Sequence, residues 1–240
     1  MTREMDHINK GDTYLESGQF EKAIAEYNKA IKLDPKDALA YLNRGNSYAK
    51  LEQYTMAITD YSKAIALDPM DASAYINRGN SYAKFEQYTM AITDYSKAIE
   101  LDPMDASAYF DLGSSYANLG QYDQAIAEYT NAIALDPMDS LAYRNRGHSY
   151  GNLEQYDKAI DDFTQAIKHD SKCASAYFGR GITHNVLEQY DRAIADFTLA
   201  IKLAPMIASG YRNRGMAYEG LGQPALAEAD RQRALELEKE

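Results

Sequence analysis

Glycine recurs in this chain at a fixed interval of 34 residues, and this spacing constrains the fold more than any other feature. The seven members are Gly11, Gly45, Gly79, Gly113, Gly147, Gly181 and Gly215. If each is numbered position 8 of a repeat, all 21 tyrosines of the chain fall on only four repeat positions. A constant period of this length is typical of an array of like structural units, each too small to bury a core by itself.

The residues around each glycine predict two amphipathic helices per repeat. Positions 4, 8 and 11, like positions 20, 24 and 27, are three, four or seven residues apart, which places each set on one helix face. Positions 20 and 27 are alanine in all seven repeats, and position 24 is aromatic in six. We therefore expect helix A over about positions 1–14 and helix B over about positions 17–30. The glycine is expected to admit helix B closely, against its alanines.

Proline and aspartate mark the ends of these helices. Position 32, where a residue without an N–H stops helix B, holds five of the six prolines: Pro35, Pro69, Pro103, Pro137 and Pro205. Two residues further on, the predicted N-caps of the next helix A are Asp37, Asp71, Asp105 and Asp139. Cys173 and Ile207 stand at the equivalent positions after repeats five and six, so we expect lower local stability at these two junctions.

The pattern Tyr-x3-Gly-x2-Tyr, followed by Ala-x3-Tyr/Phe-x2-Ala-x4-Pro, resembles the tetratricopeptide repeat family over essentially the whole chain. Tyrosine replaces the tryptophan usual at position 4 of that family. The resemblance implies an all-α fold: a right-handed α-solenoid superhelix of helix-turn-helix repeats, with the A helices lining its concave face. We expect one array over residues 4–240, with repeats at about 4–37, 38–71, 72–105, 106–139, 140–173, 174–207 and 208–240.

The two ends of the array differ in sequence. Arg231 replaces the position-24 aromatic residue in the last repeat. The same helix is made polar by Arg233, Glu236, Glu238, Lys239 and Glu240. This helix is predicted to act as a cap, whereas no cap precedes the first repeat, whose open end offers a surface for stacking on a second copy.

Charge and composition exclude several classes of function. A formal charge of −11 disfavours binding to nucleic-acid phosphates and to anionic membranes, so neither partner is expected. The single Cys173 rules out an internal disulfide framework and suits a reducing compartment. Neither an apolar stretch of membrane-spanning length nor a signal-like N-terminus in Met1–Lys10 is evident, which predicts a cytoplasmic protein.

No catalytic or metal-binding pattern can be recognised. The four histidines, His7, His148, His169 and His184, lie in four different repeats and share no metal-ligand spacing with each other or with Cys173. Each glycine is explained by the repeat or its turns, so no phosphate-binding loop is indicated, and no cofactor is expected. A tyrosine ladder that stacks on nucleic-acid bases is disfavoured by the helix-core spacing and by the net charge.

Two repeat positions vary together. Where position 7 is arginine (Arg44, Arg78, Arg146, Arg180, Arg214), position 23 of the same repeat is aspartate (Asp60, Asp94, Asp162, Asp196, Asp230). Where position 7 is Lys10 or Leu112, position 23 is Glu26 or Glu128. The pattern predicts an ion pair between helices A and B, although descent from a common repeat would also produce it.

A second stripe on helix A, at positions 2, 5, 6, 9, 12 and 13, is free of the core and is a candidate binding surface. Position 6 is asparagine in five repeats: Asn9, Asn43, Asn77, Asn145 and Asn213. Asparagine is a poor residue for a helix interior, but its amide both donates and accepts, as the backbone of a bound peptide requires. Some tetratricopeptide superhelices bind extended peptides through such an asparagine ladder. The alternatives are a duplicated surface residue, or asparagine bonding to the next repeat.

Other positions of this stripe give the predicted groove a mixed character. Position 5 offers the apolar residues Leu42, Ile76, Phe110 and Phe178, and position 9 offers Asn46, Asn80 and His148. The basic members are Lys50, Lys84, Arg144 and Arg212. Position 2 has no basic residue, so the clamp for a C-terminal carboxylate found in some family members is incomplete here.

These observations predict a non-catalytic adaptor that holds an extended protein or peptide segment with apolar and some acidic side chains. The alternative is a self-assembling scaffold that forms homo-oligomers through its open N-terminal end or its convex surface.

One pair of repeats is nearly identical: residues 41–71 and 75–105 differ only at Leu42/Ile76, Leu51/Phe85 and Ala66/Glu100, which indicates a recent duplication.

Overall fold

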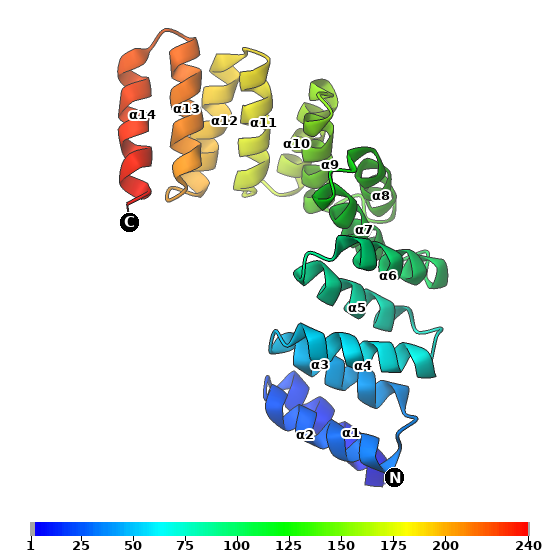
Figure 1. Ribbon diagram of the computed structural model, residues 1–240. Helices are drawn as coiled ribbons and strands as arrows, with labels where there is room; N and C mark the ends of the chain where they lie inside the picture. Colours follow the sequence, from blue (N-terminus) through cyan, green and yellow to red (C-terminus); the bar gives the residue numbers. More distant parts are fainter. Residues whose placement is uncertain (1–2, 240) are drawn as a thin grey trace. The chain divides into compact units, whose positions relative to one another are not determined.

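The computed structural model describes residues 3–239, so Met1, Thr2 and Glu240, which enter the N-terminal and cap predictions, lie outside the described residues. The chain forms pairs of α-helices joined by short turns (Figure 1). The A helices are α1 (Arg3–Glu16), α3 (Ala38–Lys50), α5 (Ala72–Lys84), α7 (Ala106–Asn118), α9 (Ser140–Asn152), α11 (Ala174–Val186) and α13 (Ala208–Gly220). The B helices are α2 (Phe20–Leu33), α4 (Tyr54–Leu67), α6 (Tyr88–Leu101), α8 (Tyr122–Leu135), α10 (Tyr156–His169), α12 (Tyr190–Leu203) and α14 (Pro224–Leu237). The predicted all-α fold of helix pairs is confirmed.

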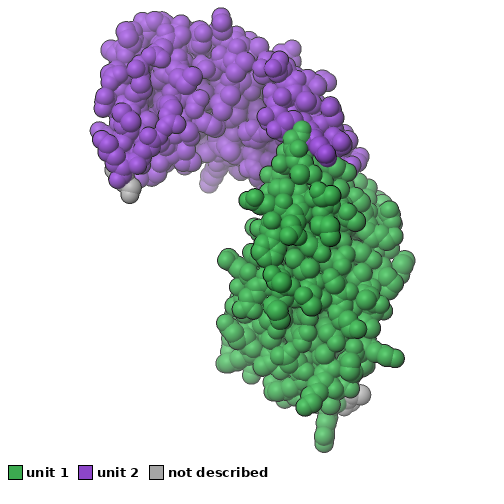
Figure 2. Space-filling model, viewed as in Figure 1, with its two compact units in different colours: residues 1–120 green, residues 121–240 purple. Residues whose placement is uncertain are grey.

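The chain divides into two compact units, residues 1–120 (unit 1) and residues 121–240 (unit 2) (Figure 2). The division falls in the turn between α7 and α8, inside the fourth repeat. Within each unit every helix packs against the next one along the chain, and the A helices of neighbouring repeats also contact one another. The single array over residues 4–240 stays a prediction, and each unit is described by itself.

The aromatic ring at position 24 is the centre of the core of each repeat. Its most buried members, each at most 2% exposed, are Tyr27, Tyr61, Tyr95, Tyr129, Phe163 and Phe197. A Cβ on Gly45 would lie 2.7 Å from the ring of Tyr61, and a Cβ on Gly181 would lie 2.8 Å from that of Phe197. At these two glycines the ring, rather than an alanine of helix B, requires the missing side chain. The expected approach to the alanines is found at Gly215, where a Cβ would lie 3.2 Å from the backbone oxygen of Ala227.

The predicted helix ends are also found. The carboxylate of Asp37 accepts hydrogen bonds from the backbone N–H groups of Leu39 and Ala40, and α2 ends at Leu33, two residues before Pro35. Asp71, Asp105 and Asp139 cap the next three A helices in the same way. Cys173 and Ile207 make no side-chain cap bond, so α11 and α13 begin without this stabilisation. Their lower local stability stays a prediction.

The predicted arginine–aspartate pairs are present in all five repeats. Arg44 donates from Nε and Nη2 to the two carboxylate oxygens of Asp60, at 2.7 and 2.6 Å. Equivalent two-point pairs join Arg78–Asp94, Arg146–Asp162, Arg180–Asp196 and Arg214–Asp230. This geometry holds the guanidinium by two parallel charge-assisted hydrogen bonds.

The third nitrogen of each of these arginines connects to the repeat before. Nη1 of Arg44 donates to Oδ1 of Asn28, which lies on α2. The corresponding acceptors at position 25 are Ser62, Thr130, Thr164 and Thr198. One guanidinium therefore joins three helices and two repeats, a role that the covariation of positions 7 and 23 did not predict.

Candidate functional site

Within residues 3–239, the same nine repeat positions line each of three hollows along the predicted stripe of helix A. Each takes positions 9, 12, 13, 17 and 24 of one repeat and positions 6, 9, 10 and 13 of the next. Hollow I, of about 470 Å³, lies between α3 and α5, and hollow II, of about 400 Å³, between α5 and α7. Hollow III, of about 240 Å³, belongs to unit 2 and lies between α9 and α11.

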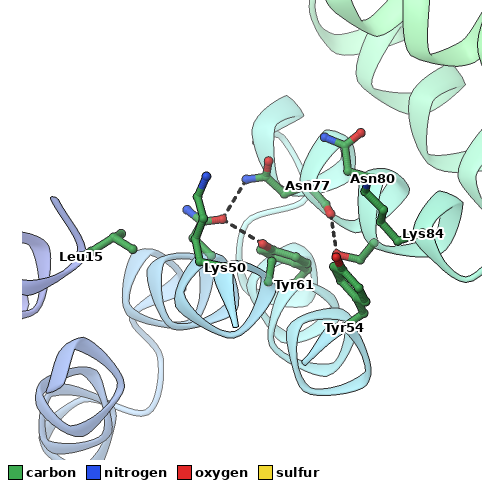
Figure 3. Close-up of a pocket in the computed structure, with 10 residues that line it drawn as sticks. Leu15, Lys50, Tyr54, Tyr61, Asn77, Asn80 and Lys84 are labelled. Atoms are coloured by element: carbon green, nitrogen blue, oxygen red, sulfur yellow. Dashed lines mark hydrogen bonds between the residues drawn. The ribbon is translucent and has the colours of Figure 1, made fainter. Parts of the chain in front are cut away.

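The linings show how far the three hollows differ. Hollow I is lined by Asn46, Ala49, Lys50, Tyr54, Tyr61, Asn77, Asn80, Ser81 and Lys84, with Leu15 of α1 in addition (Figure 3). Hollow II is lined by Asn80, Ala83, Lys84, Tyr88, Tyr95, Asp111, Ser114, Ser115 and Asn118. Hollow III is lined by His148, Gly151, Asn152, Tyr156, Phe163, Gly179, Ile182, Thr183 and Val186.

A hydrogen-bonded relay forms the floor of hollow I. The hydroxyl of Tyr61 donates to Oδ1 of Asn46 at 2.9 Å, and Nδ2 of Asn77 donates to the same oxygen at 3.1 Å (Figure 3). Burial raises the pKa of Tyr61, so its hydroxyl keeps its proton and remains a donor. The relay connects the core of one repeat with the candidate ladder residue of the next.

The same relay occurs one repeat earlier. The hydroxyl of Tyr27 and Nδ2 of Asn43 both donate to Oδ1 of Asp12, at 2.7 and 2.9 Å. Asn43 and Asn77 therefore bond to a neighbouring repeat, as one of the alternatives to the ladder proposed, but to the preceding repeat and not to the next one. These bonds use the amide nitrogen and leave the amide oxygen as an acceptor on the stripe.

The remaining ladder residues do not share this geometry. Oδ1 of Asn145 accepts from the guanidinium of Arg144, its neighbour in sequence, and Nδ2 of Asn213 donates to the backbone carbonyl of Ser209. Asn9 lies exposed on α1. Binding of a peptide backbone by a uniform series of five asparagines therefore stays a prediction, and the structure distinguishes two of them from the rest.

Hollow II has a carboxylate where hollow I has an amide. The hydroxyl of Tyr95 donates to Oδ1 of Asn80 at 2.6 Å, as in the relay, but the position-6 residue is Asp111. Burial raises the pKa of Asp111 to about 6, and the negative charge of Asp105 adds to this effect. Hollow II is thus a polar space with one weakly acidic carboxyl group.

Hollow III is built around a ring without a hydroxyl. His148 packs edge-on against Phe163, with ring centroids 4.9 Å apart. A Cβ at Gly179 would lie 2.6 Å from Cζ of Phe163, which explains why the asparagine of position 6 is replaced by glycine here. The half-exposed Ile182 and Val186 complete a more apolar lining.

The position-5 residues predicted for the groove do not line the hollows. Leu42 is a correction: it is only 8% exposed and packs in the core against Ala57 and Tyr61. Ile76 and Phe110 are half-buried. Phe178 lines a separate apolar cavity of about 120 Å³, together with Ile201 and Ile207 among others.

Of the four basic residues of the predicted groove, two line a hollow and two do not. Lys50 and Lys84 are exposed and line the hollows of unit 1. Nη1 of Arg144 donates to Ser175, and Arg212 is ion-paired with Glu238, which directly follows α14. Neither arginine reaches a hollow, so lysine supplies the positive charge of these sites.

The sequence reasoning missed the tyrosines at position 17. It assigned the tyrosines to the core, whereas Tyr54, Tyr88 and Tyr156 are half-buried and line the three hollows. A signal was available, because position 17 is the first residue of helix B and lies beside the turn, at the end of the core face. Tyrosine recurs there in five repeats.

Residues 3–239 show no sign of two other kinds of site. Among them no group of three or more His, Cys, Asp or Glu side chains is arranged to hold a metal ion. In the same part of the chain, no helix has the length and the apolar character needed to cross a membrane.

Comparison with known families decides the class of the protein. A model of the TPR repeat matches residues 11–52, 45–85, 86–120 and 113–154, and tetratricopeptide repeat models match residues 140–173 and 174–205. The chain belongs to the tetratricopeptide repeat family. The tetratricopeptide repeat is a helical scaffold for protein interaction, which is the class of function shown for this chain.

Solved structures agree with this assignment. The chain is similar to the MamA protein (27% identity, TM-score 0.65, covering 70% of this chain and 92% of MamA). It is also similar to YrrB, described as a TPR protein with an unusual peptide-binding site (26%, 0.67, covering 82% and 97%). A TPR repeat-containing protein from Cytophaga hutchinsonii shares the fold (20%, 0.77, covering 96% and 95%). No curated protein matches the sequence.

Proposed function

We propose that this protein is a non-catalytic adaptor that binds an extended peptide segment along the hollows of its A helices. The observation that carries the proposal is the use of the same nine repeat positions in three separate hollows. Helices in contact lie about 8–10 Å apart and an extended peptide advances about 3.1–3.4 Å per residue, so neighbouring hollows suit side chains about three residues apart. A repeating ligand conformation fits a repeating site.

The polar groups of hollow I support a peptide rather than a small apolar ligand. Asn77 presents an amide oxygen that can accept from a backbone N–H, and Lys50 and Lys84 can each pair with a carboxylate or donate to a carbonyl. Tyr54 adds an aromatic wall, which is a frequent contributor to binding energy at protein interfaces. The family resemblance to YrrB, whose structure is described by its peptide-binding site, points in the same direction.

A reducing compartment such as the cytoplasm suits this adaptor, because its one cysteine, Cys173, is buried and free. Neither nucleic acid nor membrane lipid is proposed as a partner, since the formal charge is −11.

Selection from a phage-displayed library of linear peptides tests the proposal, with affinities then measured by fluorescence anisotropy on synthetic peptides. The variant Lys50→Ala/Asn77→Ala/Lys84→Ala removes the polar groups of hollow I and is expected to weaken binding by about tenfold or more. Lys63→Ala, at an exposed lysine outside the hollows, is the control and should bind as the unmodified protein does.

Two results would count against the proposal. The first is a protein that selects no peptide, and the second is a set of peptides whose affinity does not change in the triple variant. A protein that selects no peptide but whose size in solution rises with its concentration would instead support the self-assembling scaffold.

A further inference from the structure

Asp111 stands at repeat position 6, where the other six repeats have asparagine or glycine, which are neutral. In hollow II it stands on α7, at the repeat position where hollow I has Asn77. It shares hollow II with Asn80 and Lys84 of α5 and with Tyr88 and Tyr95 of α6. Its side chain is half-buried, so the carboxylate is both reachable and partly removed from water.

A carboxylate cannot take over the hydrogen bond that the asparagine makes. Asn77 completes the relay of hollow I by donating its N–H to Oδ1 of Asn46. In hollow II the equivalent oxygen of Asn80 accepts from Tyr95, and an ionised Asp111 has only acceptor atoms to place beside it. The change from asparagine to aspartate therefore removes the donor of the relay and adds acceptor oxygens to the lining of the hollow.

The charges around Asp111 do not neutralise it. Among residues 3–239 its carboxylate takes part in no ion pair, and Lys84 lines the hollow without coming within ion-pair distance of it. Asp105, at the N-cap of α7, is negative, and burial raises the pKa of Tyr95, whose hydroxyl stays neutral at physiological pH. Burial and Asp105 together raise the pKa of Asp111 to about 6, as expected of a carboxylate that lacks a nearby cation.

We propose that hollow II is a specificity subsite for a lysine or arginine side chain of the bound peptide, with Asp111 as the acceptor of its charged head. The inference rests on the proposed function and deepens it by naming the chemistry of one ligand residue. The rings of Tyr88 and Tyr95 border the hollow, and aromatic faces favour a cation next to the carboxylate. A ligand cation restores the charge balance that the folded protein lacks at this point.

The neighbouring hollow adds a second element to the recognised pattern. Hollow I carries two lysines, Lys50 and Lys84, and favours an acidic ligand residue. Because the hollows are one repeat apart, the preferred ligand has an acidic and a basic residue separated by about three positions. This pattern adds a basic residue to the ligand with apolar and some acidic side chains that the sequence alone suggested.

Peptide selection on the unmodified protein and on Asp111→Asn gives the first test. Asn is the residue found at the equivalent positions 43 and 77, so this variant is expected to fold normally. Peptides selected by the unmodified protein should share a lysine or arginine at one position. Their affinity should fall about tenfold in Asp111→Asn, as for the loss of a charge-assisted contact. Replacing that lysine by norleucine should weaken binding to the unmodified protein and leave binding to Asp111→Asn unchanged.

Asp123→Asn is the matched control, since it removes the same charge from an exposed position outside the hollows. It should bind the lysine peptide as the unmodified protein does. Affinity of the unmodified protein for this peptide should also rise between pH 5 and pH 7.5, because Asp111 ionises over this range, whereas that of Asp111→Asn should change little.

A second measurement does not depend on peptide binding. NMR titration of the Asp111 carboxyl carbon in the full chain should show its pKa lowered by millimolar Nα-acetyl-lysine-N-methylamide and unchanged by the norleucine analogue. If the selected peptides lack a basic position and bind Asp111→Asn equally well, the cation subsite is wrong and the adaptor function stands. If no peptide is selected, the adaptor function falls, and an unchanged NMR titration overturns the subsite as well.

Discussion

Units 1 and 2 form hollows from the same repeat positions, but the residues at the bottom of the hollow are polar in unit 1 and more apolar in unit 2. In hollow I the core ring is Tyr61, whose hydroxyl reaches the stripe through Asn46 and Asn77. In hollow III the ring is Phe163, and its edge is covered by His148 and by the backbone at Gly179. The backbone plan is shared, and the polarity of the floor follows from one hydroxyl group.

This difference shows that core and binding surface are not independent in these repeats. Position 24 is a core position and position 9 is on the stripe, yet the two change together. Where the ring has a hydroxyl, position 9 supplies an acceptor (Asp12, Asn46, Asn80). Where it is phenylalanine, position 9 is His148 or Ile182. The buried residue thus decides which polar atoms remain for a ligand.

The largest expected effect on the free energy of unfolding concerns the arginine–aspartate pairs, which both units contain. Arg78→Leu in unit 1 and Arg146→Leu in unit 2 each leave a buried aspartate without its two-point partner, since Asp94 and Asp162 are 3% and 5% exposed. An uncompensated buried carboxylate costs about 3–5 kcal/mol, and we expect a similar loss from both variants. Urea unfolding followed by far-UV circular dichroism measures it.

The double variants Arg78→Leu/Asp94→Leu and Arg146→Leu/Asp162→Leu serve as controls and should recover part of the loss, because they remove the unpaired charge as well. A single-variant loss below about 1 kcal/mol in either unit would show that the pair there contributes no more than an exposed one.

The next effect is confined to unit 1 and depends on pH. The ordinary pKa of an aspartate, 3.8, is raised to about 6 at Asp111 in the folded chain. From about pH 4 to about pH 6 the folded state therefore holds more protons than the unfolded state, and the free energy of unfolding falls as pH rises. Asp111→Asn removes this loss and should gain up to about 3 kcal/mol at pH 7, with no gain at pH 3.

Thermal unfolding of Asp111→Asn and of the exposed-site control Asp123→Asn across this pH range measures the difference. Equal stability of Asp111→Asn and the unmodified protein at pH 7 would mean that the carboxylate is already compensated.

The packing of the ring against helix A predicts an effect of intermediate size in both units. An alanine at Gly45 or at Gly181 places a Cβ within 3 Å of the ring of Tyr61 or Phe197. Overpacking of this kind costs about 1–3 kcal/mol. Gly151→Ala is a matched control within helix α9, where a Cβ meets nothing within 4 Å. It should stabilise the protein by up to about 1 kcal/mol through helix propensity alone. Chemical denaturation distinguishes opposite signs, and a gain at Gly45 would disprove the packing role.

The smallest effect tests the relay itself. Tyr61→Phe deletes one of the two donors to Asn46 and should cost about 0.5–1.5 kcal/mol. The reverse change in unit 2, Phe197→Tyr, adds a hydroxyl where position 9 is Ile182, which has no acceptor, so no stability should be gained. A gain from Phe197→Tyr equal to the loss from Tyr61→Phe would mean that the two floors are interchangeable.

The fold was predictable from the sequence because its determinants are local and occur seven times. Helix limits, aspartate caps and the arginine–aspartate pairs all follow from residues whose spacing repeats. The hollows were harder to predict. Leu42 and Asn43 are adjacent in the sequence, and only the packing of α3 against α4 places one in the core and the other on the stripe. The relay joins three residues from two repeats, and a helix-by-helix analysis does not connect them.

The arginine contacts give each repeat a direction. Five repeats have the position-7 arginine, and repeat two shows both sides of the contact: Arg44 reaches back to Asn28 of the repeat before, and Ser62 receives Arg78 of the repeat after. Such a 34-residue repeat carries both the arginine donor and the position-25 acceptor. If the repeat is duplicated in tandem, the arginine of one copy can therefore donate to the acceptor of the other. Residues 41–71 and 75–105, almost identical in sequence, are consistent with such an event. Unequal recombination within such a pair can lengthen or shorten the gene in one step and still keep the arginine contact at the copied junction.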